Sequence, residues 1–255
     1  MGRLSILCAF FLPLLIVRCE SVEIFGGNEA KPHSRPYMVL LKNPGFCGGT
    51  LIRPNWVLTA AHCKMNYSTE VILGAHNWKE REKEQQRLQV LKWVPHPYFD
   101  FRKKLNDIQL VQLKSAAKIN KFVNVFPLPT SDENIKKPLC STAGWGMTSP
   151  KSEKLSNVLR EANLNIVENA SCQKSYEKLY IKITDDMICA GPLKKRKDDA
   201  CPGDSGGPLI CSNSLRGIVS FGPQCGNPKI PGVYTRLSAK YLKWIRTTIG
   251  GALEN

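Results

Sequence analysis

Short apolar runs, each closed by turn residues, recur along most of the chain. In Tyr37–Leu41, Trp56–Thr59 and Ile108–Leu113 the aliphatic, aromatic and β-branched side chains are those that strands favour. Pro and Gly separate the runs at close spacing, as in KNPGFCGG and FGPQCGNPKIPG. The pattern predicts a mostly β fold of antiparallel barrels or sandwiches. The predicted strands are Tyr37–Leu41, Trp56–Thr59, Val71–Leu73, Leu88–Val94, Ile108–Leu113, Leu159–Ile166, Leu215–Phe221 and Gly232–Arg236.

Helical spacing is clear only near the C-terminal end. Apolar residues recur there at the intervals that place side chains on one face of a helix. Ser238 is predicted to cap this helix and Gly250 to end it. An apolar face of this kind favours packing against the strands over a functional role. The residues that form the face are Tyr241, Leu242, Ile245 and Ile249.

The first residues differ in composition from the remainder of the chain. A mostly apolar run, Leu4–Val17, follows Arg3 and precedes small or turn-favouring residues around Cys19 and Ser21. The run is too short to span a bilayer, so it indicates a secretory signal peptide over 1–21, cleaved after Cys19 or after Ser21. No later stretch is long and apolar enough to span a membrane. We therefore expect a secreted protein.

The cysteine content fits that compartment. Of ten cysteines, Cys8 and Cys19 lie in the leader and eight remain. An even set in an oxidising compartment favours four disulfides. Zinc ligation is the alternative, but the chain lacks the Cys-x-x-Cys and His-x-x-x-His spacings typical of zinc sites. We expect neither a metal nor a cofactor. The eight cysteines are Cys47, Cys63, Cys140, Cys172, Cys189, Cys201, Cys211 and Cys225.

The chain is strongly basic, with a formal net charge of +15 over 255 residues. A secreted protein of this charge is expected to attract sulfated glycans or other polyanions, although solvated surface lysines explain part of the charge. The run Lys194–Lys197 is interpreted as a solvated or polyanion-binding loop rather than a nuclear-import signal. An apolar content of 42% suffices for the core of one large domain or two small ones.

Candidate chemistry gathers in three stretches. KDDACPGDSGGP places Ser205 among glycines, VLTAAHCK places His62 where a strand ends, and LNDIQLVQL places Asp107 before an alternating strand. A serine hydroxyl becomes a nucleophile only with a nearby base, and an imidazole base needs an acid that holds its tautomer. A histidine or an aspartate alone is more often structural. The three residues together match what nucleophilic catalysis requires.

The stretches LTAAHC, NDIQLVQL and GDSGGP, in the order His, Asp, Ser, resemble the trypsin and chymotrypsin family of serine proteases. The resemblance covers nearly all of Ile24–Ile249 and includes IFGG, CGGTLI, AGWG and PGVYTRLS. Within the family the chain is similar to the granzymes of killer lymphocytes, through GGNEAKPHSRPYMVLL, VILGAHN and LREANLNI. The resemblance implies a protease domain over 24–255 made of two six-stranded antiparallel β-barrels, roughly 24–125 and 126–236, followed by a C-terminal helix over 238–249.

The same resemblance implies a role for each candidate catalytic residue. Ser205 would be the nucleophile that forms an acyl-enzyme, His62 the general base and then the general acid, and Asp107 the group that orients the imidazole. The backbone amides of Gly203 and Ser205 would hold the oxyanion of the tetrahedral intermediate.

Substrate preference is implied by Asp199, six residues before Ser205. In the family an acid there forms the floor of the primary pocket and selects Arg or Lys in protein substrates. Ala200 follows where many relatives have Ser, which removes a hydroxyl that helps to hold a lysine and favours Arg. The pocket walls would be Ser220, Phe221, Gly222 and Gly232.

Activation is implied by Asp204, whose carboxylate in the family pairs with the amino group made by cutting before Ile24. The residue before that cut is Glu23, which an Arg- or Lys-cutting enzyme would not favour. Cleavage of the leader leaves either 22–23 or 20–23, an even remainder that suits a dipeptidyl peptidase, as for granzymes in general. We expect a nearly inactive precursor, because a buried carboxylate without a cation is costly.

By family spacing the disulfides would leave no spare thiol in the mature chain, so we expect a monomer without an interchain disulfide. Two sequons, at Asn66 and Asn169, are candidate sites for N-linked glycan. The implied pairs are Cys47 with Cys63, Cys140 with Cys211, Cys172 with Cys189, and Cys201 with Cys225.

Two other functions remain open at this point. A cationic granule protein could bind polyanions or microbial membranes without proteolysis, but the presence of His62, Asp107 and Ser205 favours an enzyme. A digestive or venom trypsin-like protease shares the chemistry, but its precursor more often has Arg or Lys where this chain has Glu23. The sequence thus favours a secreted or granule-stored endopeptidase that cleaves after Arg or Lys and acts as a granzyme-like effector.

Overall fold

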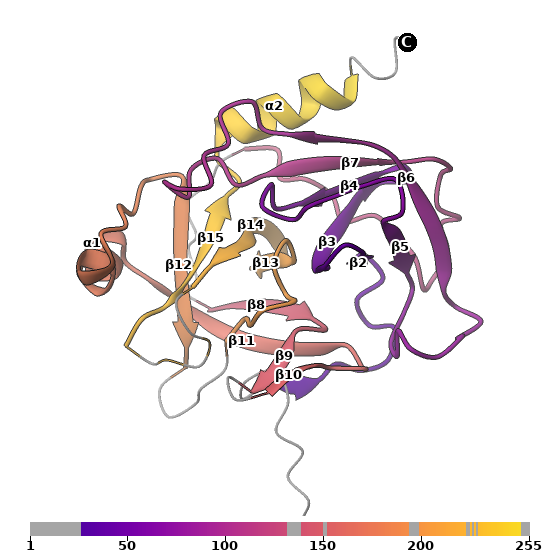
Figure 1. Cartoon of the computed structure of the whole chain (residues 1–255), viewed down its shortest axis with the longest axis horizontal. Helices are drawn as coiled ribbons and strands as arrows, with labels where there is room; N and C mark the ends of the chain where they lie inside the picture. The colour runs from indigo at the N-terminus through magenta and orange to yellow at the C-terminus, as the bar shows by residue number, and fades with distance from the viewer. Residues whose placement is uncertain are drawn as a thin grey trace, which may run out of the picture.

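The computed structural model describes residues 27–131, 139–149, 152–193, 199–222, 225, 227 and 229–250. The predicted leader, the propeptide, Ile24 and Lys194–Lys197 lie outside this part of the chain. Figure 1 shows two groups of strands side by side, the N-terminal one in indigo to purple and the C-terminal one in red to yellow. The C-terminal helix, α2, lies across the outside of both.

The first group is a closed antiparallel barrel with strand order β2-β3-β4-β7-β6-β5. Strand β2 explains its construction, because all of its first four side chains are buried. Val39 and Leu41 join the cluster inside the barrel, whereas Met38 and Leu40 join the cluster outside it. The two-residue period of a strand therefore supplies two cores. The strands are β2 Met38–Lys42, β3 Phe46–Arg53, β4 Trp56–Thr59, β5 Glu70–Leu73, β6 Gln86–Pro95 and β7 Gln109–Leu113.

The second group is also a six-stranded barrel. Its order is β11-β12-β15-β14-β13-β8, and β8 pairs back onto β11 to close the ring. Strand β1 (Asn28–Glu29) adds to β11, and β9 (Met147–Ser149) forms a hairpin with β10 (Ser152–Leu155). The predicted fold of two six-stranded antiparallel barrels is confirmed. The remaining strands are β8 Leu139–Gly144, β11 Arg160–Val167, β12 Met187–Pro192, β13 Pro208–Cys211, β14 Ser214–Phe221 and β15 Gly232–Arg236.

Every predicted strand is present, with ends that shift by at most two residues. Strands β3, β8, β12 and β13 were not predicted, because their Gly, Pro, Ser and Cys residues are typical of turns. In β3 the glycines permit close packing: a Cβ on Gly49 would collide with Val57, and one on Gly48 would lie 3.0 Å from the Gly207 Cα. What reads as a turn in the sequence is thus a strand that packs tightly against its neighbours.

Helix α2 spans Ala239–Gly250, so it begins one residue later than predicted and includes Gly250. The Ser238 carbonyl accepts the Leu242 amide at 3.0 Å, and the Ser238 hydroxyl donates to Asp186 Oδ1 at 3.0 Å. Helix α1 (Asn169–Tyr176) and the 3₁₀ turn η1 (Glu177–Leu179) were not predicted. In α1 only Cys172 and Tyr176 are buried, which is too few for a clear apolar period.

Four disulfides lie within the described residues, and they join the pairs that the family resemblance implies. One links neighbouring strands of the second barrel, because Cys140 on β8 and Cys211 on β13 are register partners. Another fixes α1 to β12 through Cys172 and Cys189. The full set is Cys47–Cys63, Cys140–Cys211, Cys172–Cys189 and Cys201–Cys225.

The largest apolar cluster joins both barrels to α2. It contains Leu40 and Ile52 from the first barrel, Leu215 and Ile218 from the second, and Ile245 from the helix. All five side chains are almost fully buried. This shared core fixes the position of one barrel relative to the other, and so the geometry of the space between them. Within the described residues, no helix is long and apolar enough to cross a membrane.

Replacement of Ile245 by Ala should lower the free energy of unfolding by about 2–5 kcal/mol, because it leaves a cavity where the side chain is fully buried. Chemical denaturation of the Ser205→Ala form, which avoids self-digestion, measures the change. Lys243→Ala, on the exposed face of the same helix, is the matched control and should change the value by less than about 0.5 kcal/mol. Equal losses in the two variants would contradict the packing described here.

Candidate active site

A cavity of about 350 Å³ lies between the barrels. His62 and Asp107 reach it from the first barrel, and Ser205 reaches it from the second. The predicted pocket residues line the same space, so the fold brings together groups that are up to 170 positions apart in the sequence (62 to 232). The predicted residues that line it are His62, Asp107, Asp199, Ala200, Ser205, Ser220, Phe221, Gly222 and Gly232.

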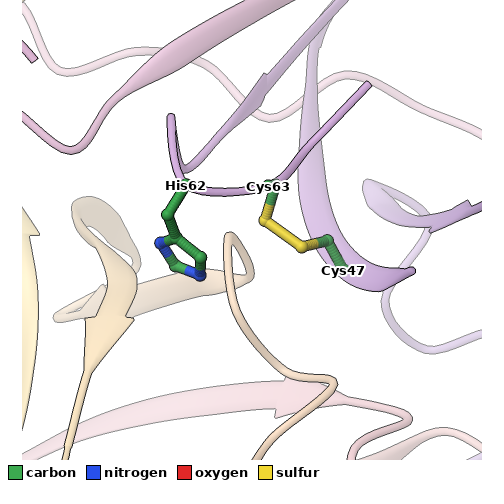
Figure 2. Close-up of side chains that lie close together, drawn as sticks. All are labelled: Cys47, His62 and Cys63. Atoms are coloured by element: carbon green, nitrogen blue, oxygen red, sulfur yellow. A yellow bond between two sulfur atoms is a disulfide. The ribbon is translucent and has the colours of Figure 1, made fainter. Parts of the chain in front are cut away.

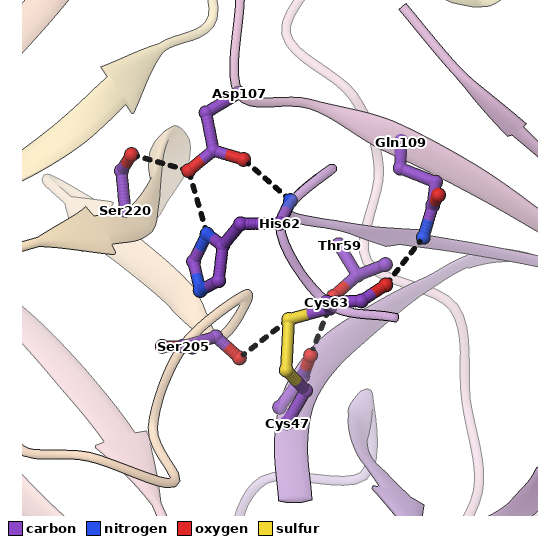
Figure 3. The surroundings of a disulfide bond; sticks show 9 residues. Cys47, Thr59, His62, Cys63, Asp107, Gln109, Ser205 and Ser220 are labelled. Carbon is purple, nitrogen blue, oxygen red and sulfur yellow. Dashed lines mark hydrogen bonds and ion pairs between the residues drawn. A yellow bond between two sulfur atoms is a disulfide. The ribbon is translucent and has the colours of Figure 1, made fainter. Parts of the chain in front are cut away.

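His62 and Asp107 form the first part of the site. His62 lies in the turn after β4, and its Nδ1 is 2.7 Å from Asp107 Oδ2, while its backbone amide donates to Asp107 Oδ1 at 2.9 Å. A carboxylate only accepts, so Nδ1 carries the proton and the neutral ring presents Nε2 as a base. Figure 3 shows the imidazole held on one side by Asp107 and directed toward Ser205 on the other.

Asp107 also contacts the second barrel. The Ser220 hydroxyl on β14 donates to Asp107 Oδ2 at 2.5 Å, as Figure 3 shows, and the Thr235 hydroxyl on β15 donates to the Asp107 carbonyl at 2.8 Å. The aspartate is 4% exposed. Hydrogen bonds from both barrels therefore offset the desolvation of this carboxylate.

The turn that carries Ser205 is pressed against the first barrel. The Gly48 amide on β3 donates to the Ser205 carbonyl at 2.7 Å, and the Thr59 hydroxyl donates to the Gly48 carbonyl at 2.8 Å. Gly206 has φ +82°, and a Cβ there would collide with Thr59. Only glycine fits this position, because the backbone conformation and the space both exclude a side chain.

Two amides in this turn differ from the others in having no acceptor within the described residues. The amides of Asp204, Gly206 and Gly207 donate to backbone carbonyls within the protein. Among the described residues no group accepts from the Gly203 or the Ser205 amide, and both residues are partly exposed. Gly203 has φ +97°, which a residue with a side chain adopts only with strain. Two unused N–H groups beside a serine hydroxyl suit the stabilisation of a developing oxyanion.

The far end of the cavity is acidic. Asp199 is 3% exposed, and a Cβ on Gly232 would lie 3.3 Å from Asp199 Oδ1. A Cβ on Gly222 would lie 3.7 Å from the Gly232 Cα, so the two glycines face one another beside the carboxylate. Burial raises the pKa of Tyr234, and the nearby Asp199 charge raises it further. A buried carboxylate and two glycines therefore lie together in the lining of the cavity.

Asp204 lies behind the Ser205 turn and is 1% exposed. Its carboxylate accepts the Gly146 amide at 2.7 Å and the Cys201 amide at 2.9 Å. A Cβ on Gly144 or Gly146 would collide with this carboxylate, so both glycines are needed to enclose it. Burial raises the pKa of Asp204 to about 6, although the two amides lower it.

Gly27 is fixed by a residue that pairs with the strand bordering this carboxylate. Arg160 on β11 is 3% exposed and donates from Nη2 to the Gly27 carbonyl at 3.0 Å. Arg160 is also the register partner of Gly144, which borders Asp204. Ile24 itself lies outside the described residues, but Gly27 is only three residues away from it.

One group of potential metal ligands is found in the described part of the chain. It comprises Cys47, His62 and Cys63, whose ligand atoms lie within 4.8 Å of one another. Figure 2 shows that the two sulfur atoms are bonded to each other. A disulfide offers no thiolate, so this group does not have the chemistry of a zinc site. The disulfide instead fixes the turn of His62 to β3.

Several residues of the site were missed from the sequence. Thr235 was not singled out, and Ser220 was assigned only to the pocket wall. Phe99, Phe101 and Lys104, from the loop before Asp107, line the cavity. Aromatic residues within a polar loop, as in PYFDFRKK, were the available signal for this lining. No local pattern marks Thr235, because its bond spans 128 positions.

The two sequons lie on the surface of the first and second barrels. The Asn66 side-chain oxygen accepts the Ser68 amide at 2.9 Å, and Asn169 is the exposed first residue of α1. Glycan at either position stays a prediction.

Comparison with known proteins gives a consistent result. The family model described as Trypsin matches residues 24–245. Granzyme A of Bos taurus is 44% identical over 250 residues, which cover 97% of this chain and 95% of that protein. Mast cell protease 3 of Ovis aries is 42% identical over 253 residues, covering 96% of each chain. Cathepsin G of Homo sapiens is 40% identical over 255 residues, covering 98% of this chain and 95% of that protein.

The raised pKa of Asp204 predicts how the stability of the uncleaved chain depends on pH. An unfolded carboxyl has a pKa of 3.8, so this group stabilises the fold below pH 4, and that stability is lost as pH rises through about 6. The expected loss is roughly 3 kcal/mol. Urea denaturation of the uncleaved Ser205→Ala chain between pH 4 and pH 7 measures it.

Asp204→Asn in the same background is the control, because it removes the titrating group and leaves the other carboxylates in place. The free energy of unfolding of the Asp204 chain, relative to that of the Asp204→Asn chain, should fall by roughly 3 kcal/mol between pH 4 and pH 7. Curves that stay parallel would show that Asp204 does not titrate in this range.

Proposed function

Since the chain belongs to the trypsin family of serine proteases, we propose that it is an endopeptidase that cleaves after Arg, and less readily after Lys. It is a serine endopeptidase related to the granzymes. The observation that carries the finer proposal is the buried carboxylate of Asp199 in the cavity that His62 and Ser205 border. In this proposal a substrate side chain that reaches Asp199 brings the carbonyl carbon of its residue to the Ser205 hydroxyl.

In the proposed mechanism the substrate carbonyl enters between the Ser205 hydroxyl and the amides of Gly203 and Ser205. His62 Nε2 takes the hydroxyl proton as Oγ attacks, because Nδ1 already donates to Asp107. The amides hold the oxyanion, and removing one such donor costs about 3 kcal/mol in comparable sites. The imidazolium then gives its proton to the leaving amine, and water releases the acyl group from Ser205 by the reverse proton transfers.

The proposed preference for Arg over Lys is supported by the residues that line the pocket. Gly222 and Gly232 leave room for a long side chain, and Asp199 supplies its counter-charge. A guanidinium offers a planar fork of donors to a carboxylate, whereas an ammonium is a compact charge that needs additional oxygens. Ala200, which lines the pocket, has no hydroxyl to supply one.

The proposed activation step is the release of the Ile24 amino group. Gly27 is fixed by Arg160 beside Gly144, so a freed Ile24 lies within about 10 Å of chain from an anchored residue close to Asp204. An ammonium there would stabilise the Asp204 carboxylate and the Ser205 turn. The proposed activator is a dipeptidyl peptidase that removes 22–23.

The proposed setting is a secretory granule of a cytotoxic lymphocyte. The support is the similarity to proteins named granzyme A and mast cell protease 3, together with the net charge of +15. Sulfated proteoglycan is a proposed partner of the basic surface. The monomeric state is proposed because all eight cysteines outside the leader are in disulfides.

A peptide panel that differs only at the residue before the cut tests the proposed specificity. Protein that begins at Ile24 should cleave Arg peptides faster than Lys peptides and Ala peptides hardly at all. Asp199→Ser should lower kcat/KM for Arg at least about a hundredfold, because the substrate cation is then buried without a partner. Ser205→Ala is the blank. Unchanged Arg cleavage by Asp199→Ser would refute the proposed pocket.

The activation proposal is tested with chains that begin at Ile24, at Val22, or with one extra residue before Val22. The first should be active, and the second inactive until a dipeptidyl peptidase is added. The third has an odd number of residues before Ile24. The peptidase therefore removes Glu23 together with Ile24 and never exposes the Ile24 amine, so no activity is expected. Activity of the untreated second chain would contradict the requirement for a free Ile24 amine.

A further inference from the structure

A groove lined by residues of the first barrel and by residues of β9 and β10 lies outside the cavity described above. Two adjoining hollows, of about 810 and 550 Å³, share Trp78 and Lys79, and none of their residues lines the Asp199 cavity. We call this surface the Trp78 groove. Its main lining residues are Lys42, Phe46, Trp78, Lys79, Arg81 and Leu155.

One end of the groove borders the Ser205 turn. Leu155 packs against Gly203, because a Cβ on Gly203 would lie 2.6 Å from Leu155 Cδ2. Phe46 precedes Cys47, which Figure 3 shows beside Ser205, and Gly48 donates to the Ser205 carbonyl at 2.7 Å. The groove and the Asp199 pocket thus meet the turn through different residues. A substrate that fills the pocket with residues before the cut has the groove available for residues after the cut.

Trp78 forms a rigid wall of this groove. Its indole N–H donates to the Ser156 carbonyl at 2.8 Å, and its ring packs edge-on against Phe46 with centroids 5.0 Å apart. The ammonium groups of Lys42 and Lys79 lie 5.4 and 5.5 Å from the ring centroid. The ring therefore gathers two cations at one place on the surface.

The acidic residues of the groove already have partners. Glu29 lies 2.9 Å from His76 Nε2, and Glu70 lies 2.9 Å from Arg87 Nη1. Glu82 accepts the backbone amides of His76 and Asn77, each at 2.8 Å, which together lower its pKa against the effect of burial.

Three cationic side chains of the groove have no such ion-pair partner within the described residues. Over the described ranges, no carboxylate lies within ion-pair distance of Lys42, Lys79 or Arg81. Positive charge in the groove is thus available to a ligand, and an anionic side chain is the complementary one.

We propose that the Trp78 groove binds the part of the substrate that follows the cleaved bond and selects acidic side chains there. The inference rests on the proposed endopeptidase function and adds a substrate preference to it. Phe46 lies two residues from Gly48 on β3. The Trp78 ring packs against the Phe46 ring, with centroids 5.0 Å apart. At about 3.3 Å per extended residue, the selected position falls within about four residues of the cut.

The test uses three fluorescence-quenched peptides with Arg before the cut. At the third and fourth positions after the cut, the first has two Glu residues, the second two Ser residues and the third two Lys residues. The expected kcat/KM for the Glu peptide is about three- to tenfold above that for the Ser peptide, as for solvent-exposed charge pairs, with Lys lowest. The double variant Lys42→Glu with Lys79→Glu should reverse the order. High salt should reduce the preference in both proteins.

The matched control is Lys174→Glu with Lys178→Glu, which changes the net charge equally on α1 and η1, away from β2 and β5 in Figure 1. It should retain the preference for Glu. An arginine p-nitroanilide has no peptide after the cut and should be hydrolysed equally by all three proteins. The proposed groove is wrong if the unaltered protein shows no preference for the Glu peptide, or if Lys174→Glu with Lys178→Glu also reverses that preference. Neither result contradicts the proposed function.

Binding to Ser205→Ala protein gives a readout without turnover. The acidic leaving-side peptide should bind more tightly than the neutral one, and Lys42→Glu with Lys79→Glu should remove the difference. Equal binding overturns the inference. A sulfated disaccharide that binds through Lys42 and Lys79, while the peptides do not discriminate, also overturns it and makes the groove a polyanion site. Failure to hydrolyse the anilide contradicts the proposed function separately from these outcomes.

Discussion

The buried carboxylate of Asp107 is the interaction on which the rest of the site depends. It lies just before β7 of the first barrel, yet it accepts hydrogen bonds from His62 of that barrel and from Ser220 of the other. A buried charge that loses such partners costs several kcal/mol. The barrels therefore have one favourable relative position, which the apolar core shared with α2 also requires. In that position His62 faces Ser205 across the boundary.

Asp204 is a second buried carboxylate with a different environment. Two backbone amides contact it, and burial raises its pKa to about 6. The groups that donate hydrogen bonds to the Asp107 carboxylate belong to the folded chain. In the proposed activation, the cation that pairs with Asp204 forms only when proteolysis releases the Ile24 amino group. The cost of burying a carboxylate without enough partners thus acts in two ways. At Asp107 it fixes the geometry of the site, and under the proposed activation it makes the geometry of the Ser205 turn conditional on cleavage before Ile24.

Two separate surfaces near the Ser205 turn carry charges of opposite sign. The proposed pocket contains Asp199, and the Trp78 groove contains Lys42 and Lys79. A chain that carries a basic residue before the cut and acidic residues after it would match both. The relatives named above share about two fifths of their residues with this chain. The proposed specificity depends on a few side chains placed around Ser205.

The sequence by itself determined the strands with strong apolar patterns, the terminal helix and the three stretches that carry His62, Asp107 and Ser205. These depend on local propensity and on motifs whose chemistry requires particular residue types. The sequence did not reveal β3, whose glycines serve close packing, or α1, whose apolar period is weak. Nor did it reveal the bonds of Ser220 and Thr235 to Asp107, which span 113 and 128 positions. Those contacts exist only because two closed barrels pack together, and no local pattern encodes which of their side chains meet.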